Sequence, residues 1–401
     1  MDLNRFSEFR IPQAVFYGDH SLTKLGEQAA LFGKNALLIS DRIMNQIGNV
    51  ITCQQELEKA GVQTVCYLEV NTEPTDDHVS EALSICLDNQ CDVLVAIGGG
   101  SCIDAAKAVA VLATNGGYIG DYLGGKKPIV HKPIPLIAIP TTAGTGSEVT
   151  SVTVITNTKD DIKMMIKNPA FLPTIAIVDP ILTYSSPPHV TAATGVDALC
   201  HAIEAYLSCH AQPLTDHLAL SAIELIVNNL RSTYINGENR EAREKMALAS
   251  MQAGLAFTNA SVTLVHGMSR PIGALFHVPH GVSNAMLLPA VLEFTKNSAL
   301  ERLAVIGRLL RPDLKELTTE GCADVTIHEV KKLCRDLNIP NIKTFGLDEK
   351  KFNLAVSKMA TDALASGSPG NNPRVPSYDE IIELYHTCYD YNFTVNEEVL
   401  N

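Results

Sequence analysis

Short apolar runs alternate with helix-like stretches through the first half of the chain. Buried runs without polar alternation are typical of parallel strands that are covered on both faces. Most of these runs are followed by loop or helix-start signals, which predicts a doubly wound, mostly parallel α/β sheet. The predicted strands are residues 35–40, 62–68, 92–97, 134–139 and 174–178.

The pattern changes after Pro187 and Pro188. From there to about Tyr391, apolar residues recur at helical spacing among Ala, Leu, Glu and Lys, and no convincing strand pattern remains. We therefore predict two domains, an α/β domain over residues 1–186 and an all-α domain over residues 187–401.

Composition and charge narrow the class of protein. Hydrophobic residues make up 46% and charged residues 19% of the 401 residues, which predicts a packed globular protein. The net charge of −13 argues against a nucleic-acid partner. The start MDLNRFSEFR lacks an apolar signal-peptide core and no run reaches membrane-spanning length, so we expect a cytoplasmic protein without a membrane partner. In that compartment the ten cysteines are expected to be reduced, and because they include no CxxC pair we expect no thiolate zinc site.

Two glycine-rich segments follow predicted strands of the same sheet. GGGS at residues 98–101 comes after one strand and runs into a helix, and TTAGTGSE at residues 141–148 comes after another. A tight turn is the alternative for GGGS alone, which matches neither a P-loop nor a full GxGxxG fingerprint. Loops at the carboxyl ends of neighbouring strands converge on one ligand, so we predict a dinucleotide-binding domain. The candidate residues of the first segment are Gly98, Gly99, Gly100, Ser101 and, in the helix, Asp104.

Asp41 ends the predicted strand at 35–40. An acidic side chain at this place accepts hydrogen bonds from a ribose 2′-hydroxyl and repels a 2′-phosphate, which favours NAD over NADP. The alternative is an ordinary N-cap for the helix that follows.

A carboxylate and three imidazoles form a candidate metal site in the second half. Asp197 and His201 are four residues apart, so on a helix they project from one face toward one ion. His266 and His280 follow further along, and this donor set suits Fe(II) or Zn(II). Glu204 lies on the same face as Asp197 and is a candidate for supporting a ligand from behind. For any single histidine, the alternative is a satisfied core or surface position.

Five ordered motifs along the chain resemble those of the iron-containing (group III) alcohol dehydrogenases. The resemblance covers essentially the whole chain and implies an active site in the cleft between an α/β and a helical domain. It implies a metal-dependent oxidoreductase that transfers hydride between NAD(H) and a small alcohol or aldehyde, with the metal polarising the substrate oxygen. The motifs are GGGSCIDAAK at 98–107, TTAGTGSE at 141–148, AIVDP at 176–180, GVDALCHAIEAY at 195–206 and HGMSRPIGALFHVPHG at 266–281.

The matching motifs also imply residue roles. Asp197, His201, His266 and His280 would hold the catalytic metal, usually Fe(II), and the turn at 98–101 would hold the pyrophosphate. The residues that would line the nucleotide or contact its ribose are Thr141, Thr142, Ser147 and Lys163.

One position departs from the family pattern. Many members have a histidine four residues after the third metal ligand, where it serves proton relay or substrate positioning, whereas this chain has Arg270. Arginine stays protonated at neutral pH, so His277 is the candidate relay, with outer packing as its alternative. Arg270 would instead pair with a carboxylate-bearing substrate.

Several alternatives stay open. The same scaffold serves glycerol dehydrogenases, maleylacetate reductases and dehydroquinate synthases, and a catalytically silent metal- or nucleotide-binding regulator is a further alternative. Short alcohols, diols, lactaldehyde and ω-hydroxy acids all fit as substrates. By the same resemblance, we expect a homodimer or a larger homo-oligomer.

Overall fold

The computed structural model describes residues 6–160, 162–314 and 316–395. These residues form two compact units, which are treated separately below. One unit is Arg10–Ser186, and the other comprises residues 187–395 together with residues 6–9.

The first unit is built on a six-stranded sheet in which all paired strands are parallel. Five of its strands coincide with the five predicted runs, which confirms the mostly parallel sheet. The sixth, β1, is a short edge strand of four half-buried residues that the apolar pattern did not predict. In spatial order the strands are β1 (Ala14–Tyr17), β8 (Ile175–Val178), β5 (Leu136–Pro140), β4 (Val93–Gly98), β2 (Asn35–Ile39) and β3 (Gln63–Tyr67).

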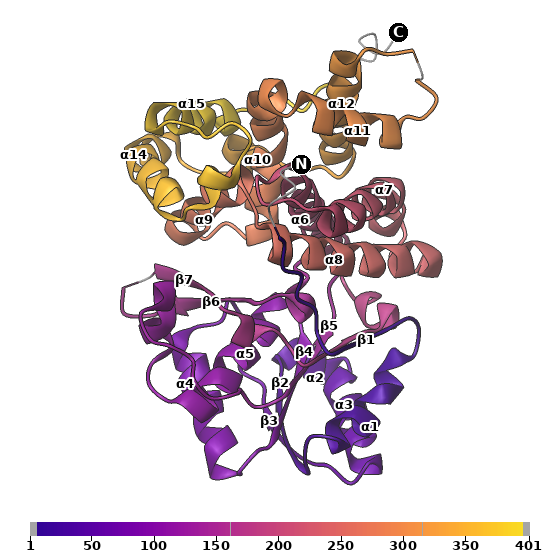
Figure 1. Ribbon diagram of the computed structural model, residues 1–401, viewed down its shortest axis with the longest axis vertical. Coiled ribbons are helices and arrows are strands. Elements are labelled where there is room, and N and C mark those ends of the chain that lie inside the picture. Colours follow the sequence, from indigo (N-terminus) through magenta and orange to yellow (C-terminus); the bar gives the residue numbers. More distant parts are fainter. Residues whose placement is uncertain (1–5, 161, 315, 396–401) are drawn as a thin grey trace. The chain divides into compact units, whose positions relative to one another are not determined.

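Helices cover both faces of this sheet because alternate residues of each strand point to opposite sides. Leu37 and Leu94 pack with α4 (Asp76–Asp88) and α5 (Gly100–Asn115) in one apolar layer. Leu38 and Val95 pack with α1 and α3 in the other layer. Figure 1 shows α4 and α5 on one side of the sheet and α1 and α3 on the other. The remaining helices of this unit are α1 (Leu25–Ala30), α2 (Arg42–Gln46), α3 (Asn49–Lys59) and five 3₁₀ turns, Ser21–Lys24, Ile119–Gly125, Ser147–Val149, Pro169–Phe171 and Pro180–Thr183.

A separate antiparallel pair, β6 (Val152–Asn157) and β7 (Ile162–Lys167), follows the second glycine-rich segment. The sequence analysis did not predict this pair. It lies against α5, since the β6 residues Thr153 and Val154 bond to the backbone and side chain of Asp104.

The second unit contains only helices and turns in the part of the chain that the structure describes, which confirms the all-α prediction. Its central helix, α6, starts at Pro188, where proline needs no backbone hydrogen bond, and is buried along nearly its whole length. Helices α7, α8 and α10 pack around it. The helices are α6 (Pro188–Leu207), α7 (Pro213–Ile235), α8 (Arg240–Ala260), α9 (Leu264–Phe276), α10 (His280–Thr295), α11 (Leu300–Leu310), α12 (Thr319–Asp336), α13 (Ile342–Phe345), α14 (Glu349–Ala365) and α15 (Tyr378–Tyr389), with 3₁₀ turns at Lys296–Ser298 and Ser368–Asn371.

Two sequence expectations concern the chain as a whole. All ten cysteines are free thiols in the structure. Among the described helices, none combines the length and apolar character that crossing a bilayer requires.

Candidate functional site

Four side chains converge on one point in the helical unit. Asp197 and His201 come from successive turns of α6, His266 from α9 and His280 from the first position of α10. One ligand atom from each lies within 4.8 Å of the other three. The Nε2 atoms of His266 and His280 lie 3.6 and 3.9 Å from the Asp197 Oδ1 atom. Ligands about 2.1 Å from a tetrahedral ion are roughly 3.4 Å apart, so these side chains need only small movements to close around an ion.

Glycine allows α10 to approach α6 closely at this point. A Cβ atom on Gly281 would lie 2.6 Å from the Ala193 carbonyl oxygen and 3.4 Å from the Asp197 Cβ atom. Because this glycine follows His280 directly, the close packing of the two backbones sets the position of the third imidazole relative to Asp197.

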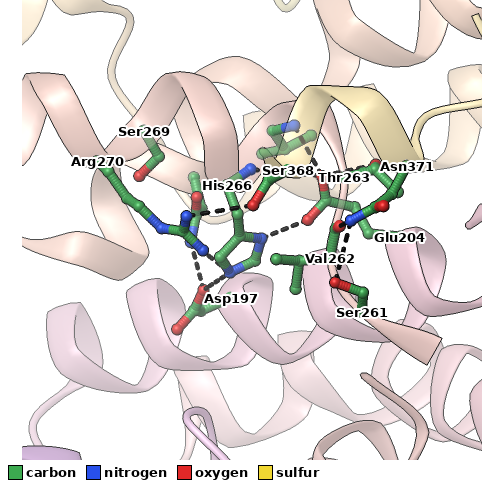
Figure 2. Close-up of polar contacts among 12 residues, drawn as sticks. Asp197, Glu204, Ser261, Val262, Thr263, His266, Ser269, Arg270, Ser368 and Asn371 are labelled. Carbon is green, nitrogen blue, oxygen red and sulfur yellow. Dashed lines mark hydrogen bonds and ion pairs between the residues drawn. The ribbon is translucent and has the colours of Figure 1, made fainter. Parts of the chain in front are cut away.

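Glu204 orients His266 from the side opposite the cluster (Figure 2). One carboxylate oxygen accepts hydrogen bonds from the Thr263 hydroxyl at 2.9 Å, the Val265 N–H at 2.7 Å and the His266 N–H at 3.3 Å. The other oxygen is bonded to the His266 Nδ1 atom. A proton on Nδ1 leaves the Nε2 lone pair facing the cluster, which is the tautomer a metal ligand needs. This confirms that Glu204 supports one of the four side chains.

The carboxylates of the site are ionised although they are buried. Burial acts to raise the pKa of Asp197, but the neighbouring imidazoles, His201 first, hold that pKa below its ordinary range. Burial also acts to raise the pKa of Glu204, and His266 lowers it. The converse holds for His266, where burial lowers the pKa and Glu204 raises it, to about 9 overall. The two buried carboxylates therefore favour a positive charge between them, either a proton on His266 or a metal ion that replaces that proton.

The sequence analysis did not identify Asn284, which lies one helical turn after His280. Its Nδ2 atom is 2.6 Å from Asp197 Oδ1, 3.1 Å from His266 Nε2 and 3.2 Å from His280 Nε2. An amide nitrogen carries two protons, which cannot serve three acceptors at once. The Asn284 Oδ1 atom is buried without a hydrogen-bond partner in the described chain. A carboxylate oxygen and two ring nitrogens gathered around one point form a donor set that suits a divalent metal.

Arg270 and His277 lie in different surroundings. Arg270 is half-buried on α9, and Figure 2 shows its guanidinium pointing toward His266 and Asp197. Its Nη1 atom donates to the Ser368 hydroxyl at 3.1 Å. His277 is exposed and ends α9 in a left-handed conformation with φ +53°. Its role as a proton relay stays a prediction.

The two glycine-rich segments of the α/β unit lie against each other. The Thr141 N–H donates to the Gly98 carbonyl at 3.0 Å, and a Cβ atom on Gly100 would lie 2.9 Å from the Thr145 side chain. Gly98 has φ +152°, a conformation that L side chains rarely adopt, and a Cβ atom there would meet the Cys102 sulfur at 2.6 Å. Helix α5 starts at Gly100, so the N–H groups of its first turn, which have no acceptor within the helix, lie at the junction of the two segments.

A buried hydrogen-bond network around Lys107 supports these segments. Lys107 Nζ donates to the Ser147 hydroxyl at 2.7 Å, the Thr150 hydroxyl at 3.0 Å and the Val152 carbonyl at 2.7 Å. Ser147 in turn donates to an Asp104 carboxylate oxygen at 2.6 Å. Ser147 and Asp104 are thus bonded within the protein, although the sequence analysis placed both among the nucleotide contacts. Lys107 was not singled out, although a lysine within an apolar helical run was a signal for it.

The remaining candidates of this unit lie as follows. Asp41 is the N-cap of α2 and accepts from the Met44 N–H at 2.8 Å, as the alternative interpretation had it, while its other oxygen faces the Cys102 sulfur at 3.7 Å. Lys163 on β7 forms an ion pair with Glu73 at 2.6 Å. Thr142 lies beside Gly99, whose Cβ position would be 3.9 Å from the threonine methyl.

Comparison with known proteins gives matches along nearly the whole chain. Residues 12–180 match the family model "Iron-containing alcohol dehydrogenase", and residues 191–389 match "Fe-containing alcohol dehydrogenase family, C-terminal". The 1,3-propanediol dehydrogenase of Citrobacter freundii is 38% identical, over 96% of this chain and 99% of that protein. The crystal structure of a 1,3-propanediol oxidoreductase superposes with a TM-score of 0.92 at 36% identity, over 96% of this chain and 100% of that one. A sulfoacetaldehyde reductase from Bifidobacterium kashiwanohense, solved with NAD⁺, gives a TM-score of 0.86 at 30% identity, over 97% of this chain and 100% of that one.

Proposed function

Since the chain belongs to the iron-containing alcohol dehydrogenase family, we propose that Fe(II) is its catalytic metal and NAD its cofactor. The enzyme is an NAD-linked oxidoreductase acting on alcohols or aldehydes. The observation that supports a metal-dependent reaction most directly is the convergence of four ligand atoms within 4.8 Å. We assign these ligands to Asp197, His201, His266 and His280.

A divalent ion held by these four side chains would supply Lewis acidity toward the substrate's oxygen, and nicotinamide would supply or accept the hydride. The protein's own residues prepare that chemistry. Glu204 keeps the proton of His266 on Nδ1, so that Nε2 stays a lone-pair donor. The buried Asp197 contributes the negative charge that offsets part of the ion's charge.

For the cofactor, we assign the pyrophosphate to the N-terminus of α5 at Gly98–Ser101, where free N–H groups and the helix dipole favour anions. Thr141 and Thr142 lie beside this turn and complete the assignment. We assign Ser147 and Asp104 to holding the loop through Lys107. We assign Asp41, which has one oxygen not used by the N-cap, to the ribose, and we assign Lys163 to it as well. The acidic side chain of Asp41 favours NAD over NADP.

The test is anaerobic purification and metal analysis, followed by nicotinamide absorbance with a panel of short alcohols and aldehydes. We expect about one metal ion per chain, as one four-ligand site requires, and turnover with NAD in preference to NADP. Asp197→Ala and His266→Ala should lose metal and turnover while keeping NAD binding. Full metal content and rate in either variant would contradict the ligand assignment. Bound metal and NAD without any redox change would instead favour a lyase or regulatory role.

A further inference from the structure

Arg270 is a half-buried cation that contacts no carboxylate among the residues that the structure describes. In the described part of the chain no carboxylate lies within ion-pair distance of its guanidinium, and its one hydrogen bond is to the neutral Ser368 hydroxyl. Two other arginines of the helical unit differ, since Arg231 is paired with Asp336 at 2.7 Å and Arg302 with Asp216. A guanidinium offers five N–H donors, so most of the donors of Arg270 are left for another group.

The position of Arg270 relates it to the metal ligands. It follows His266 by one turn of α9, and residues four apart lie on the same face of a helix. The view in Figure 2 agrees, with the guanidinium directed toward the His266 ring and Asp197.

The contact with Ser368 holds the guanidinium in one orientation. Ser368 opens the 3₁₀ turn Ser368–Asn371, which packs tightly on α9, because a Cβ atom on Gly267 would lie 2.8 Å from the Pro369 ring. The same turn is tied to the start of α9 by bonds from the Asn371 side chain to Ser261 and the Val262 carbonyl, both at 3.1 Å. Orientation by a neutral hydroxyl leaves the charge of Arg270 available.

With a divalent ion bound, the charges around the four-ligand cluster would not balance within the protein. Two carboxylates, Asp197 and Glu204, offset a divalent ion, and the Glu204 oxygens are already taken by His266 and its neighbours. The charge of Arg270 is then left over. Burial lowers the pKa of Arg270 to about 10, although the charge of Glu204 acts to raise it, so the group remains a cation at neutral pH. An unpaired charge removed from water is unfavourable, and an anion from outside the chain would compensate it.

We propose that the substrate carries an anionic group, a carboxylate or a sulfonate, that binds Arg270 while its hydroxyl or carbonyl group lies at the four-ligand cluster. The proposal rests on the proposed function, since it assigns a substrate class to that same site. The planar fork of a guanidinium matches two oxygens of such a group and orients the substrate as well as holding it. A short ω-hydroxy acid or the matching aldehyde acid has this arrangement.

The experiment compares aldehydes that differ only in the anionic group, with NADH as the reductant. Succinic semialdehyde is compared with butyraldehyde, and glyoxylate with acetaldehyde. In the wild type, kcat/KM should be higher for the acid of each pair. In Arg270→Gln the ratio of the two kcat/KM values should fall at least about 100-fold, mainly through KM of the acid, because a buried charged partner is lost. Arg270→Lys should recover part of that ratio because it keeps the charge.

Arg231→Gln is the matched control, since it removes a partly buried guanidinium of the same unit that already has a carboxylate partner. It should leave the ratio unchanged. A second measurement uses the wild type alone, so that it does not depend on the folding of any variant. Succinate should inhibit butyraldehyde reduction competitively with the aldehyde.

Three results would overturn the proposal. The first is equal kcat/KM for acid and neutral aldehydes in the wild type. The second is an equal loss for both members of a pair in Arg270→Gln. The third is competition between succinate and NADH rather than the aldehyde, together with a raised KM for NADH in Arg270→Gln, which would assign Arg270 to an oxyanion of the dinucleotide. Failure of the proposed function is distinguishable, since it would appear as no turnover of any aldehyde, neutral ones included.

Discussion

Replacing Glu204 by glutamine tests how the protein controls the protonation of His266. The two side chains have the same shape, and the three donors from Thr263, Val265 and the His266 backbone all reach one carboxylate oxygen, which the amide carbonyl can replace. The amide NH₂ group then takes the place of the oxygen that bonds to His266 Nδ1. Two donors cannot face each other, so Nδ1 becomes an acceptor and the ring proton moves to Nε2, the atom that faces the cluster.

The size of the effect follows from this exchange. A metal ion can bind only if the proton leaves Nε2, which restores the conflict between the Nδ1 proton and the amide. Loss of the group behind a ligating histidine typically weakens metal binding about 10- to 100-fold, or roughly 1.4 to 2.7 kcal/mol. We expect Glu204→Gln at the upper end of that range, because the favourable charged contact is replaced by a repulsive one.

The assay is a competition between the protein and a chelator for Fe(II) under anaerobic conditions, repeated with Zn(II). Thermal unfolding of the metal-free variant checks that it folds. Thr263→Val is the matched control, since it removes one donor to the same carboxylate without changing the His266 tautomer, and it should weaken metal binding far less. Wild-type affinity in Glu204→Gln, or equal losses in the two variants, would refute the reasoning.

Three further predictions concern residues around the two sites. Burial raises the pKa of Glu148 from its ordinary 4.5 to about 7, so the folded state keeps a proton that the unfolded chain releases, and stability falls as pH rises through this window. In urea unfolding, the advantage of Glu148→Gln over the wild type should therefore grow by about 3 kcal/mol between pH 4.5 and pH 8. Gly281→Ala should cost about 1 to 3 kcal/mol in thermal unfolding and lower the metal content, because its Cβ atom would press on the Ala193 carbonyl at 2.6 Å. Lys107→Met should cost about 3 to 5 kcal/mol in denaturant unfolding and weaken NAD binding in a fluorescence titration, since it leaves the Asp104 carboxylate without its cation.

Most of the sheet was predictable because strands covered on both faces are apolar throughout. The runs at 35–40 and 92–97 became β2 (Asn35–Ile39) and β4 (Val93–Gly98) with shifts of a residue. The edge strand β1 has half-buried residues and only four positions, too few to establish a pattern. The β6–β7 pair was missed because its alternating residues stand beside the polar glycine-rich segment and resemble a continued loop.

The four-ligand cluster was predictable only where helical spacing relates its members. Asp197, His201 and Glu204 belong to one helix, and their shared face follows from a periodicity of 3.6 residues. Asn284 also lies one turn from a predicted ligand, His280, but an amide is a common side chain in a helix and its spacing alone indicates nothing. Its three contacts arise from the meeting of α6, α9 and α10, which no local pattern describes.

The two glycine-rich segments show why a residue's position near a motif does not determine which way its side chain faces. Asp104 and Ser147 stand within or beside glycine-rich segments, yet both are directed to Lys107, which is three residues from Asp104 on the same face of α5. That face is covered by β6, whose Val152 carbonyl accepts a bond from the same lysine. Strand β6, which the apolar pattern did not predict, therefore helps to hold the glycine-rich segment at 141–148, which the sequence analysis did predict. Weaker NAD binding in Lys107→Met, with the loop sequence intact, would follow directly from this arrangement.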